Sequence, residues 1–264
     1  LAAERADLVV AVGFLLENAV EEAARKRPGT RFLLVDSPLL DEKGRPFELP
    51  NVRSLVFREQ EGSFLVGALA GFATRSGAVG FVGGMEVPLI ERFEAGFAAG
   101  ARTARPGVLV KRVYTGNFDD STSGKRAAET LLDQGADVVF HGAGSGGLGV
   151  IQACRERGKL AIGVDSDQAF LAHANVLTSM LKHVDYAVYL AARDAAEKRF
   201  APGTAVLGLA EGGLGLAPVR VDFPGKAEAL AKVEALRRAI VEGRLRPPAT
   251  LAELERFVPP RPQP

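Results

Sequence analysis

A short apolar run, a glycine-containing turn and an amphipathic helix follow one another repeatedly along the chain, and this alternation restricts the fold more than any other feature. It is typical of βαβ units built on a parallel sheet. The apolar runs predict strands over 8–13, 32–35, 52–57, 78–82, 108–114, 138–141, 160–164 and 176–181. The intervening segments predict helices over 17–26, 62–74, 89–104, 123–134, 148–157, 169–174, 185–198 and 226–242.

The length of 264 residues indicates two domains, because single domains most often contain about 100–150 residues. We expect lobe one over 1–76 with a return segment at 184–202, and lobe two over 77–183 with late strands at 203–222. The remainder, 223–264, is expected to form a C-terminal helix and a proline-rich tail that is extended and exposed from Arg246 onward. Crossings between the lobes are expected near Ser76, Lys182 and Pro202.

Composition and charge exclude several classes of protein. Hydrophobic residues make up 47% and charged residues 25% of the chain, and the net charge is +1. These values are ordinary for a globular protein and do not favour nucleic-acid binding. The longest apolar runs, such as Phe64–Ala73, are shorter than the roughly 20 residues that cross a bilayer. The single cysteine, Cys154, lies in a helical pattern that indicates a buried small side chain.

Four segments together carry a resemblance to a known family. They are Glu61–Gly67 (EGSFLVG), Val79–Met85 (VGFVGGM), Gly163–Gln168 (GVDSDQ) and Thr178–Lys182 (TSMLK). In this order and at this spacing they resemble the basic membrane protein family of ABC-transporter substrate-binding lipoproteins, a group that includes purine nucleoside receptors. The resemblance implies an α/β, type I periplasmic-binding-protein-like fold: two Rossmann-like lobes with parallel sheets, a hinge and a ligand cleft between them.

The same resemblance implies a function. It indicates a solute-binding protein of an ABC importer that captures a nucleoside by hinge closure, delivers it to an ABC permease and catalyses no reaction. A monomer is expected, in a periplasmic or other extracytoplasmic location, held to the membrane only through a lipid anchor outside this chain. Family members usually begin with an Asp-x-Ser-Phe-Asn segment and a further βα unit before the strand at 8–13, so the N-terminal part of lobe one is expected to be missing.

Five residues with side chains are candidates for ligand binding. Asp165 follows a buried strand, and its carboxylate can accept hydrogen bonds from vicinal hydroxyls or base N–H groups, or else cap the turn that follows. The resemblance implies that Lys182 is a cationic donor; without it, a solvated hinge lysine is expected. Phe118, in a polar turn, can stack on a base or pack under the next helix. Phe14 is a similar candidate in lobe one, and Met85 ends a strand in lobe two.

Gly142 and Gly144 open a glycine-rich stretch, Gly142–Gly147, that matches G-x-G-x-x-G after a strand. One interpretation is that backbone N–H groups approach a neutral ligand here. The alternative is a dinucleotide site, with Asp165 near the distance expected of a ribose-binding acid. This would make the chain an NAD-dependent oxidoreductase, although the motif lies in an internal βα unit.

A further alternative keeps the fold and changes the role to the ligand-sensing domain of a regulatory protein. The sequence contains no recognisable helix-turn-helix to support it. The histidines, at 141, 173 and 183, are spaced like neither a catalytic triad nor a metal site. We therefore predict no cofactor, no metal and no nucleic-acid partner.

Overall fold

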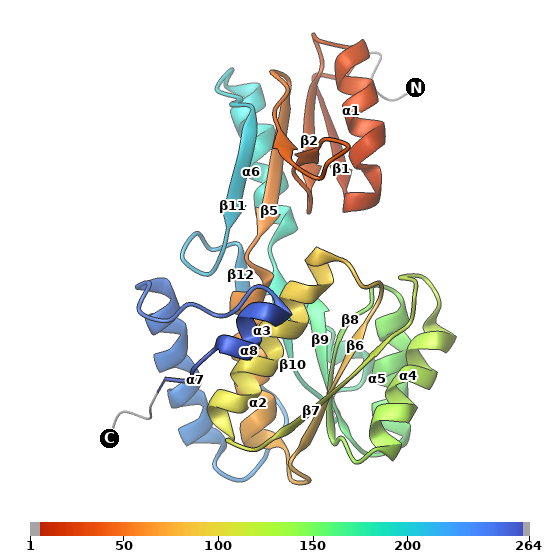
Figure 1. Ribbon diagram of the computed structural model, residues 1–264, viewed down its shortest axis with the longest axis vertical. Coiled ribbons are helices and arrows are strands. Elements are labelled where there is room, and N and C mark those ends of the chain that lie inside the picture. Colours follow the sequence, from red (N-terminus) through yellow and green to blue (C-terminus); the bar gives the residue numbers. More distant parts are fainter. Residues whose placement is uncertain (1–5, 261–264) are drawn as a thin grey trace. The chain divides into compact units, whose positions relative to one another are not determined.

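The computed structural model describes residues 6–260, and the chain divides into two compact units (Figure 1). Unit 1 contains the chain up to Phe57 together with His183–Gly213, and unit 2 contains Arg58–Lys182 together with the chain from Leu214. The chain therefore passes between the units three times, after Phe57, Lys182 and Gly213. The expectation of two lobes joined by three crossings is confirmed.

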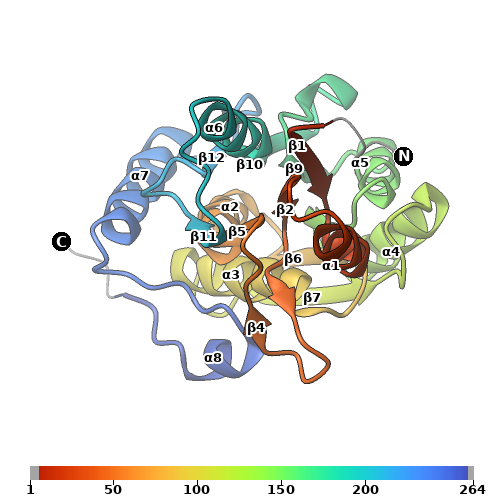
Figure 2. The ribbon, with the colours of Figure 1, turned by 90° about the horizontal axis from the view of Figure 1, so that it is seen from above.

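Unit 1 is built on a four-stranded parallel sheet in the order β1-β2-β5-β11. Helices α1 and α6 lie on opposite faces of this sheet (Figure 2). Val20 and Ala24 of α1 pack on Phe32 and Leu34 of β2. Because α1 and α6 both contact β2, the two faces of the strand are covered and it reads as one continuous apolar run. The elements are β1 (Leu8–Val12), α1 (Glu17–Lys26), β2 (Arg31–Val35), the hairpin β3 (Leu39–Leu40) and β4 (Pro46–Phe47), β5 (Val52–Phe57), α6 (Val184–Ala196) and β11 (Gly203–Leu207).

Unit 2 is built on a six-stranded sheet in the order β12-β10-β9-β8-β6-β7, parallel except for β12. Helices α2 and α3 cover one face and α4 and α5 the other (Figure 1). The elements are α2 (Glu59–Ala73), β6 (Ala78–Gly83), α3 (Pro88–Ala104), β7 (Leu109–Tyr114), α4 (Ser121–Asp133), β8 (Val138–Gly142), α5 (Gly146–Glu156), β9 (Leu160–Asp165), the 3-10 helix η3 (Ala169–Leu171), β10 (Val176–Lys182), β12 (Leu214–Leu216), α7 (Lys226–Val241) and α8 (Leu251–Arg256).

Helices α2 and α3 touch backbone to backbone. A Cβ atom placed on Gly100 would lie 1.9 Å from the carbonyl oxygen of Phe64, and one on Gly67 would lie 2.1 Å from that of Phe97. No side chain larger than hydrogen fits at these two positions while the helices stay in place. Gly67, the last residue of the segment Glu61–Gly67, and Gly100 therefore serve the packing of these two helices.

The expected domain boundaries are wrong at three places. Helix α2 belongs to unit 2, because it packs on α3 and on β10, so the crossing lies at Phe57 and not near Ser76. Strand β11 pairs with β5 of unit 1, which moves the last crossing from Pro202 to Gly213. The segment 223–264, expected to stand apart, belongs to unit 2, where α7 packs on α2 and α8 on α3.

Two local predictions are also corrected. The helix expected over 169–174 is the single 3-10 turn η3. In the tail, expected to be extended, α8 forms between the flanking prolines, because the Thr250 hydroxyl accepts the Glu253 N–H at 3.1 Å while Glu253 accepts the Ala249 N–H at 2.7 Å. Pro262 and Pro264, which belong to the expected tail, lie outside the described residues.

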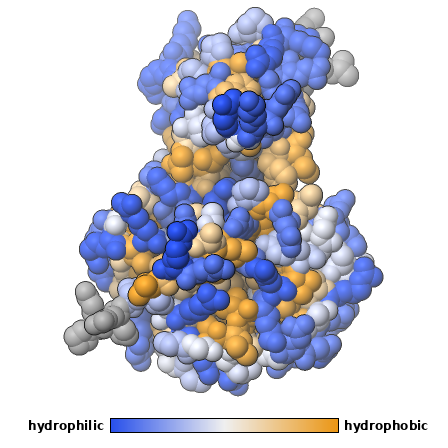
Figure 3. Space-filling view, in the orientation of Figure 1, coloured by the Kyte–Doolittle hydropathy of each residue, from blue (hydrophilic) through white to orange (hydrophobic). Residues whose placement is uncertain are grey.

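Hydrophilic residues cover most of the face shown in Figure 3, with smaller apolar areas among them. Within residues 6–260, none of the helices is both long enough and apolar enough to span a bilayer.

Candidate functional site

The predicted site residues of unit 2 all lie at one edge of its sheet, the edge at which the parallel strands end, here named the carboxyl edge. Because β7, β6, β8, β9 and β10 are neighbours, the loops that follow them are neighbours too. Each contributes at least one candidate: Phe118 after β7, Met85 after β6, Gly142 and Gly144 at and after the end of β8, Asp165 at the end of β9 and Lys182 at the end of β10. The structure thus brings together residues that are almost 100 positions apart in the sequence.

Asp165 is exposed at the end of β9 and has a left-handed backbone, with φ of 65°. Its register partner in β10 is Leu181, the residue before Lys182. An aspartate tolerates this conformation better than most residues, but it remains an uncommon one for a side chain that carries a Cβ. The structure therefore presents the Asp165 carboxylate from a tight turn at the carboxyl edge.

Lys182 is enclosed, with 4% of its side chain exposed, and its ammonium lies 3.2 Å from a carboxylate oxygen of Glu59. Glu59 is fully buried and also accepts a hydrogen bond of 2.6 Å from Nε of Arg92. The Lys182 ammonium is 6.0 Å from the centre of the Phe93 ring. Lys182 is therefore part of a buried charge cluster at the start of α2, and the alternative that it is a solvated hinge charge is wrong.

Glu59 was not singled out from the sequence. Its carboxylate stands two positions before the Glu61–Gly67 segment, at the first residue of α2, where acidic residues are common simply because of the helix dipole. Only its complete burial between two cations distinguishes it from an ordinary helix-start glutamate.

Phe118 packs against the backbone of the neighbouring loops. A Cβ atom on Gly84 would lie 2.3 Å from a ring carbon of Phe118, and one on Gly144 would lie 2.7 Å from its carbonyl oxygen. The Phe118 carbonyl also accepts the N–H of Ser145 at 2.8 Å. The half-buried Phe118 ring is thus fixed among the loops after β6 and β8; Met85, in the loop after β6, is also half buried.

The glycine-rich stretch has a packing explanation in this structure. A Cβ on Gly147 would lie 2.0 Å from the imidazole of His141, and Gly146 makes close contact with Gly124 of α4. Burial lowers the pKa of His141 to about 4, so its imidazole is neutral at ordinary pH. Gly146 and Gly147 therefore let α5 approach α4 and the end of β8, which gives these two glycines a role in packing that needs no dinucleotide.

Phe14 lies in unit 1, in the 3-10 turn η2 (Phe14–Leu16) that follows β1, and is half buried there. It stands at the carboxyl edge of the four-stranded sheet, as expected for a candidate on a βα loop.

Asp36 occupies a corresponding place in unit 1 and was not predicted. It directly follows β2 and has φ of 79°, so it shares the left-handed backbone of Asp165. The Glu17 carboxylate holds the segment that follows Asp36, because it accepts hydrogen bonds of 2.7 Å from Ser37 Oγ and from the N–H of Leu40. The signal in the sequence was the triplet Val-Asp-Ser, which ends a buried strand at 35–37 and again at 164–166.

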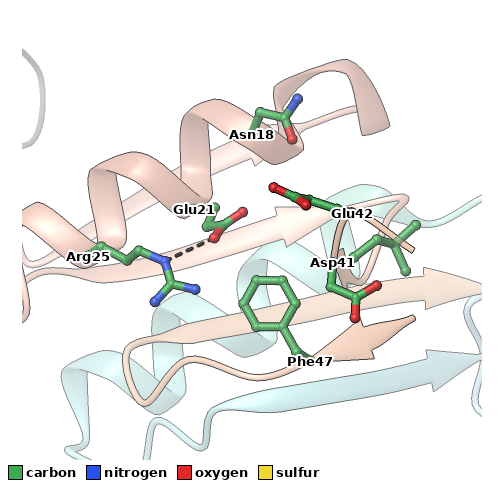
Figure 4. A pocket seen from close by; sticks show the side chains of 7 residues that line it. Asn18, Glu21, Arg25, Asp41, Glu42 and Phe47 are labelled. Atoms are coloured by element: carbon green, nitrogen blue, oxygen red, sulfur yellow. Dashed lines mark hydrogen bonds and ion pairs between the residues drawn. The ribbon is translucent and has the colours of Figure 1, made fainter. Parts of the chain in front are cut away.

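A hollow of about 510 Å³ in unit 1 lies between α1 and the β3–β4 hairpin (Figure 4). The Arg25 guanidinium bonds Glu21 at 2.9 Å and lies 5.5 Å from the centre of the Phe47 ring. A second hollow, of about 280 Å³, lies beside α3, β7 and α8 in unit 2. None of the predicted site residues lines either hollow.

Among the residues that the structure describes, no three His, Cys, Asp or Glu side chains come close enough together to hold a metal ion.

Comparison with known sequences identifies the family. A sequence model described as "Bmp: ABC transporter substrate-binding protein PnrA-like" matches residues 1–244. A CD4+ T-cell-stimulating antigen of Listeria monocytogenes is 34% identical over 259 residues, which cover 92% of this chain and 70% of the relative. The ABC transporter nucleoside-binding protein BmpA of Lactococcus lactis is 34% identical over 227 residues, covering 79% of this chain and 63% of the relative.

Solved structures show the same two-lobed architecture. A solute-binding protein of an ABC transporter system from Aeropyrum pernix K1 superposes with a TM-score of 0.80 at 31% identity, covering 97% of this chain and 78% of that one. A transcriptional activator of the comK gene from Bacillus halodurans has a TM-score of 0.78 at 20% identity, covering 92% and 81%, and shares the fold alone. The predicted type I periplasmic-binding-protein-like fold is confirmed. By the match of its sequence over residues 1–244, the chain belongs to the Bmp family of PnrA-like ABC transporter substrate-binding proteins.

Proposed function

We propose that this chain is a nucleoside-binding receptor of an ABC importer and that it catalyses no reaction. The observation that supports this best is the exposed Asp165 at the end of β9, beside the end of β10, where the enclosed Lys182 is held by Glu59. Phe118 lies on the same carboxyl edge.

This combination suits the chemistry of a nucleoside. Vicinal ribose hydroxyls and base N–H groups are donors that a carboxylate such as Asp165 accepts, and an ammonium such as Lys182 donates to ring nitrogens or hydroxyl oxygens. A phenyl ring offers a face to the base, and stacking of this kind is worth about 1–3 kcal/mol per base. A few polar groups in an otherwise apolar wall are typical of small-molecule sites. Asp36 in unit 1 is a further candidate of the same chemical type as Asp165.

Family membership supports the wider setting. A substrate-binding protein of an ABC transporter implies a small-molecule ligand, a permease that receives it and an extracytoplasmic location. The finer assignment to a nucleoside rests on the name of the Lactococcus lactis relative and on the resemblance of the motifs. A lipid anchor outside this chain and a monomeric state belong to the same proposal.

Closure of the two lobes on the ligand stays a prediction. Small-angle scattering with and without saturating nucleoside tests it, and an unchanged radius of gyration would contradict it.

Equilibrium binding to the purified protein tests the proposed ligand. Adenosine, guanosine and inosine are titrated calorimetrically into the wild type, into Asp165→Ala and into the control Asp133→Ala, whose aspartate ends α4 and pairs with Arg157. Loss of the Asp165 acceptor is expected to cost about 1–3 kcal/mol, or about 5- to 150-fold in affinity, because the ligand's donors lose their partner. Equal affinities for all three proteins would show that Asp165 is not part of the site. The absence of a binding signal with adenosine, guanosine and inosine alike would refute the ligand class.

A further inference from the structure

The sheet of unit 2 opens between β8 and β9 just below the carboxyl edge. The register between these strands ends at the pair Phe140 and Ile162, whereas the register between β9 and β10 continues to the pair Asp165 and Leu181. The last residues of β9 are therefore paired with β10 on one side only. A side chain from the following loop, that of Gln168, occupies the opening.

Gln168 bonds three neighbouring strands. Its Oε1 accepts the backbone N–H of Val164 in β9 at 3.0 Å and lies 3.0 Å from Nε2 of His141 in β8. Its own backbone N–H donates to Oγ of Ser179 in β10 at 3.1 Å. Because the Val164 N–H can only donate, Oε1 is an acceptor, and the neutral imidazole of His141 carries its proton on Nε2.

His141 has little freedom to act otherwise. Its side chain is fully buried, and Nδ1 has no hydrogen-bond partner among the described residues. The ring is held against Gly147, where a Cβ would lie 2.0 Å away. Because buried polar groups need a hydrogen-bond partner, the Nε2 atom of His141 must stay directed at Gln168. His141 therefore holds the Gln168 side chain in place.

The loop that Gln168 closes is the one that carries Asp165. Between them the chain turns sharply: the Ser166 N–H donates to the Val164 carbonyl at 2.7 Å, and Asp165 takes its left-handed backbone. Glycine at 163 is required, because a Cβ there would lie 2.4 Å from Ser179 Oγ and 2.7 Å from Gln168 Oε1. A left-handed residue with a Cβ persists only where the surroundings hold it, and such strain gathers at functional sites.

We propose that Gln168, held by His141 and Ser179, is a positioning residue that fixes the Asp165 carboxylate in its ligand-accepting orientation. The inference rests on the proposed function and extends it from a contact residue to the network that holds it. Gln168 does not itself touch the ligand in this account; it acts through the turn at Asp165. The ligand class is unchanged: a nucleoside whose hydroxyl or base N–H groups donate to a carboxylate.

A double-mutant cycle in the purified chain tests this role. Gln168→Met keeps the length of the side chain and removes its acceptor, and it is made in the wild type and in Asp165→Ala. Gln152→Met is the matched control, because Gln152 is exposed on α5, where its side-chain amide donates to the Glu156 carboxylate at 2.8 Å. Nucleoside affinity is measured for all variants, and amide hydrogen exchange is followed at Val164 and Gln168 without ligand.

Gln168→Met is expected to weaken nucleoside binding about 10-fold or more when Asp165 is present and less than about 2-fold when it is Ala, since neighbours acting through one network are not additive. Exchange at Val164 and Gln168 is expected to rise while the α2 and α3 amides stay protected. Equal losses of affinity in both backgrounds would overturn the positioning role.

Hydrogen exchange separates this inference from the proposed function. If no nucleoside binds the wild type, the proposed function fails. The exchange measurement then tests the hydrogen bonds of Gln168 by itself, because it needs no ligand. Unchanged exchange at both amides in Gln168→Met would overturn it.

Discussion

Glu59→Gln is expected to destabilise unit 2 by about 3–5 kcal/mol, the usual cost of breaking a buried ion pair by removing one partner. Glu59 is fully buried, 2.6 Å from Nε of Arg92 and 3.2 Å from the ammonium of Lys182, and Lys182 itself has 4% of its side chain exposed. The glutamine has nearly the same shape, so it creates no cavity. The substitution removes the negative charge that faces the enclosed Lys182 ammonium and the partly exposed Arg92 guanidinium.

Differential scanning calorimetry measures the effect, because it can resolve separate transitions for the two units. For a protein of this size about 1 kcal/mol corresponds to roughly 2–4 °C, so a midpoint lower by about 6–20 °C is expected. Glu228→Gln is the matched control: it also lies in the first turn of a helix and pairs with a lysine, Lys232, but both side chains are exposed. A surface pair of this kind is worth about 0–1 kcal/mol.

A second substitution tests the cause. Lys182→Met in the Glu59→Gln background removes the ammonium that has lost the carboxylate at position 59 and keeps most of the side-chain volume beside Phe93, so it is expected to restore part of the lost stability. Equal midpoints for Glu59→Gln and Glu228→Gln would refute the reasoning, as would a further loss of stability in the double variant.

The remaining predictions concern pH, helix packing and the tail. Burial lowers the pKa of His141 to about 4 in the folded protein, against about 6.5 when unfolded. Above pH 6.5 the imidazole is neutral in both states, so it causes no loss of stability. Below pH 6.5 the unfolded state binds a proton that the folded state does not, so the free energy of unfolding falls by about 3 kcal/mol as the pH drops to 4. Chemical denaturation from pH 7 to 4 should show this loss, and His141→Asn should lose the component; an identical profile in that variant would contradict the assignment. Gly100→Ala must push α3 away from the Phe64 carbonyl and is expected to cost at least about 1–3 kcal/mol in urea unfolding, whereas Gly29→Ala, with open space around it, serves as the control; equal costs would contradict the close packing. Thr250→Ala removes the N-cap oxygen of α8 and is expected to cost about 1 kcal/mol, seen as faster amide exchange confined to 251–256, and unchanged exchange there would argue against the cap.

The strands and most helices could be predicted because their signals are local. Helix α1 has the predicted bounds, since Val20 and Ala24 face the sheet while Glu21 and Arg25 pair on the outer face. Assignment of elements to lobes failed because it depends on distant partners. Nothing within residues 203–207 reveals that they pair with β5, and nothing within α2 reveals that its glycines meet α3.

The candidate site shows the same division. Asp165 could be proposed from its place after a buried strand, and topology alone then brought it beside Lys182. The roles of Glu59, His141 and Gln168 could not be predicted, because a buried ion pair and a hydrogen bond between neighbouring strands leave no periodic trace in the sequence.

A thermal-shift screen of the protein tests the central claim, binding of a nucleoside, most directly. Adenosine, guanosine, inosine, pyrimidine nucleosides, riboflavin, sugars and NAD are compared, and a ligand present at 100 times its dissociation constant should add about 2.7 kcal/mol to the stability of the folded state. A higher melting midpoint is expected with at least one nucleoside, and an unchanged midpoint with NAD. Stabilisation by NAD alone would contradict this expectation and would return the glycine-rich stretch at 142–147 to a dinucleotide site.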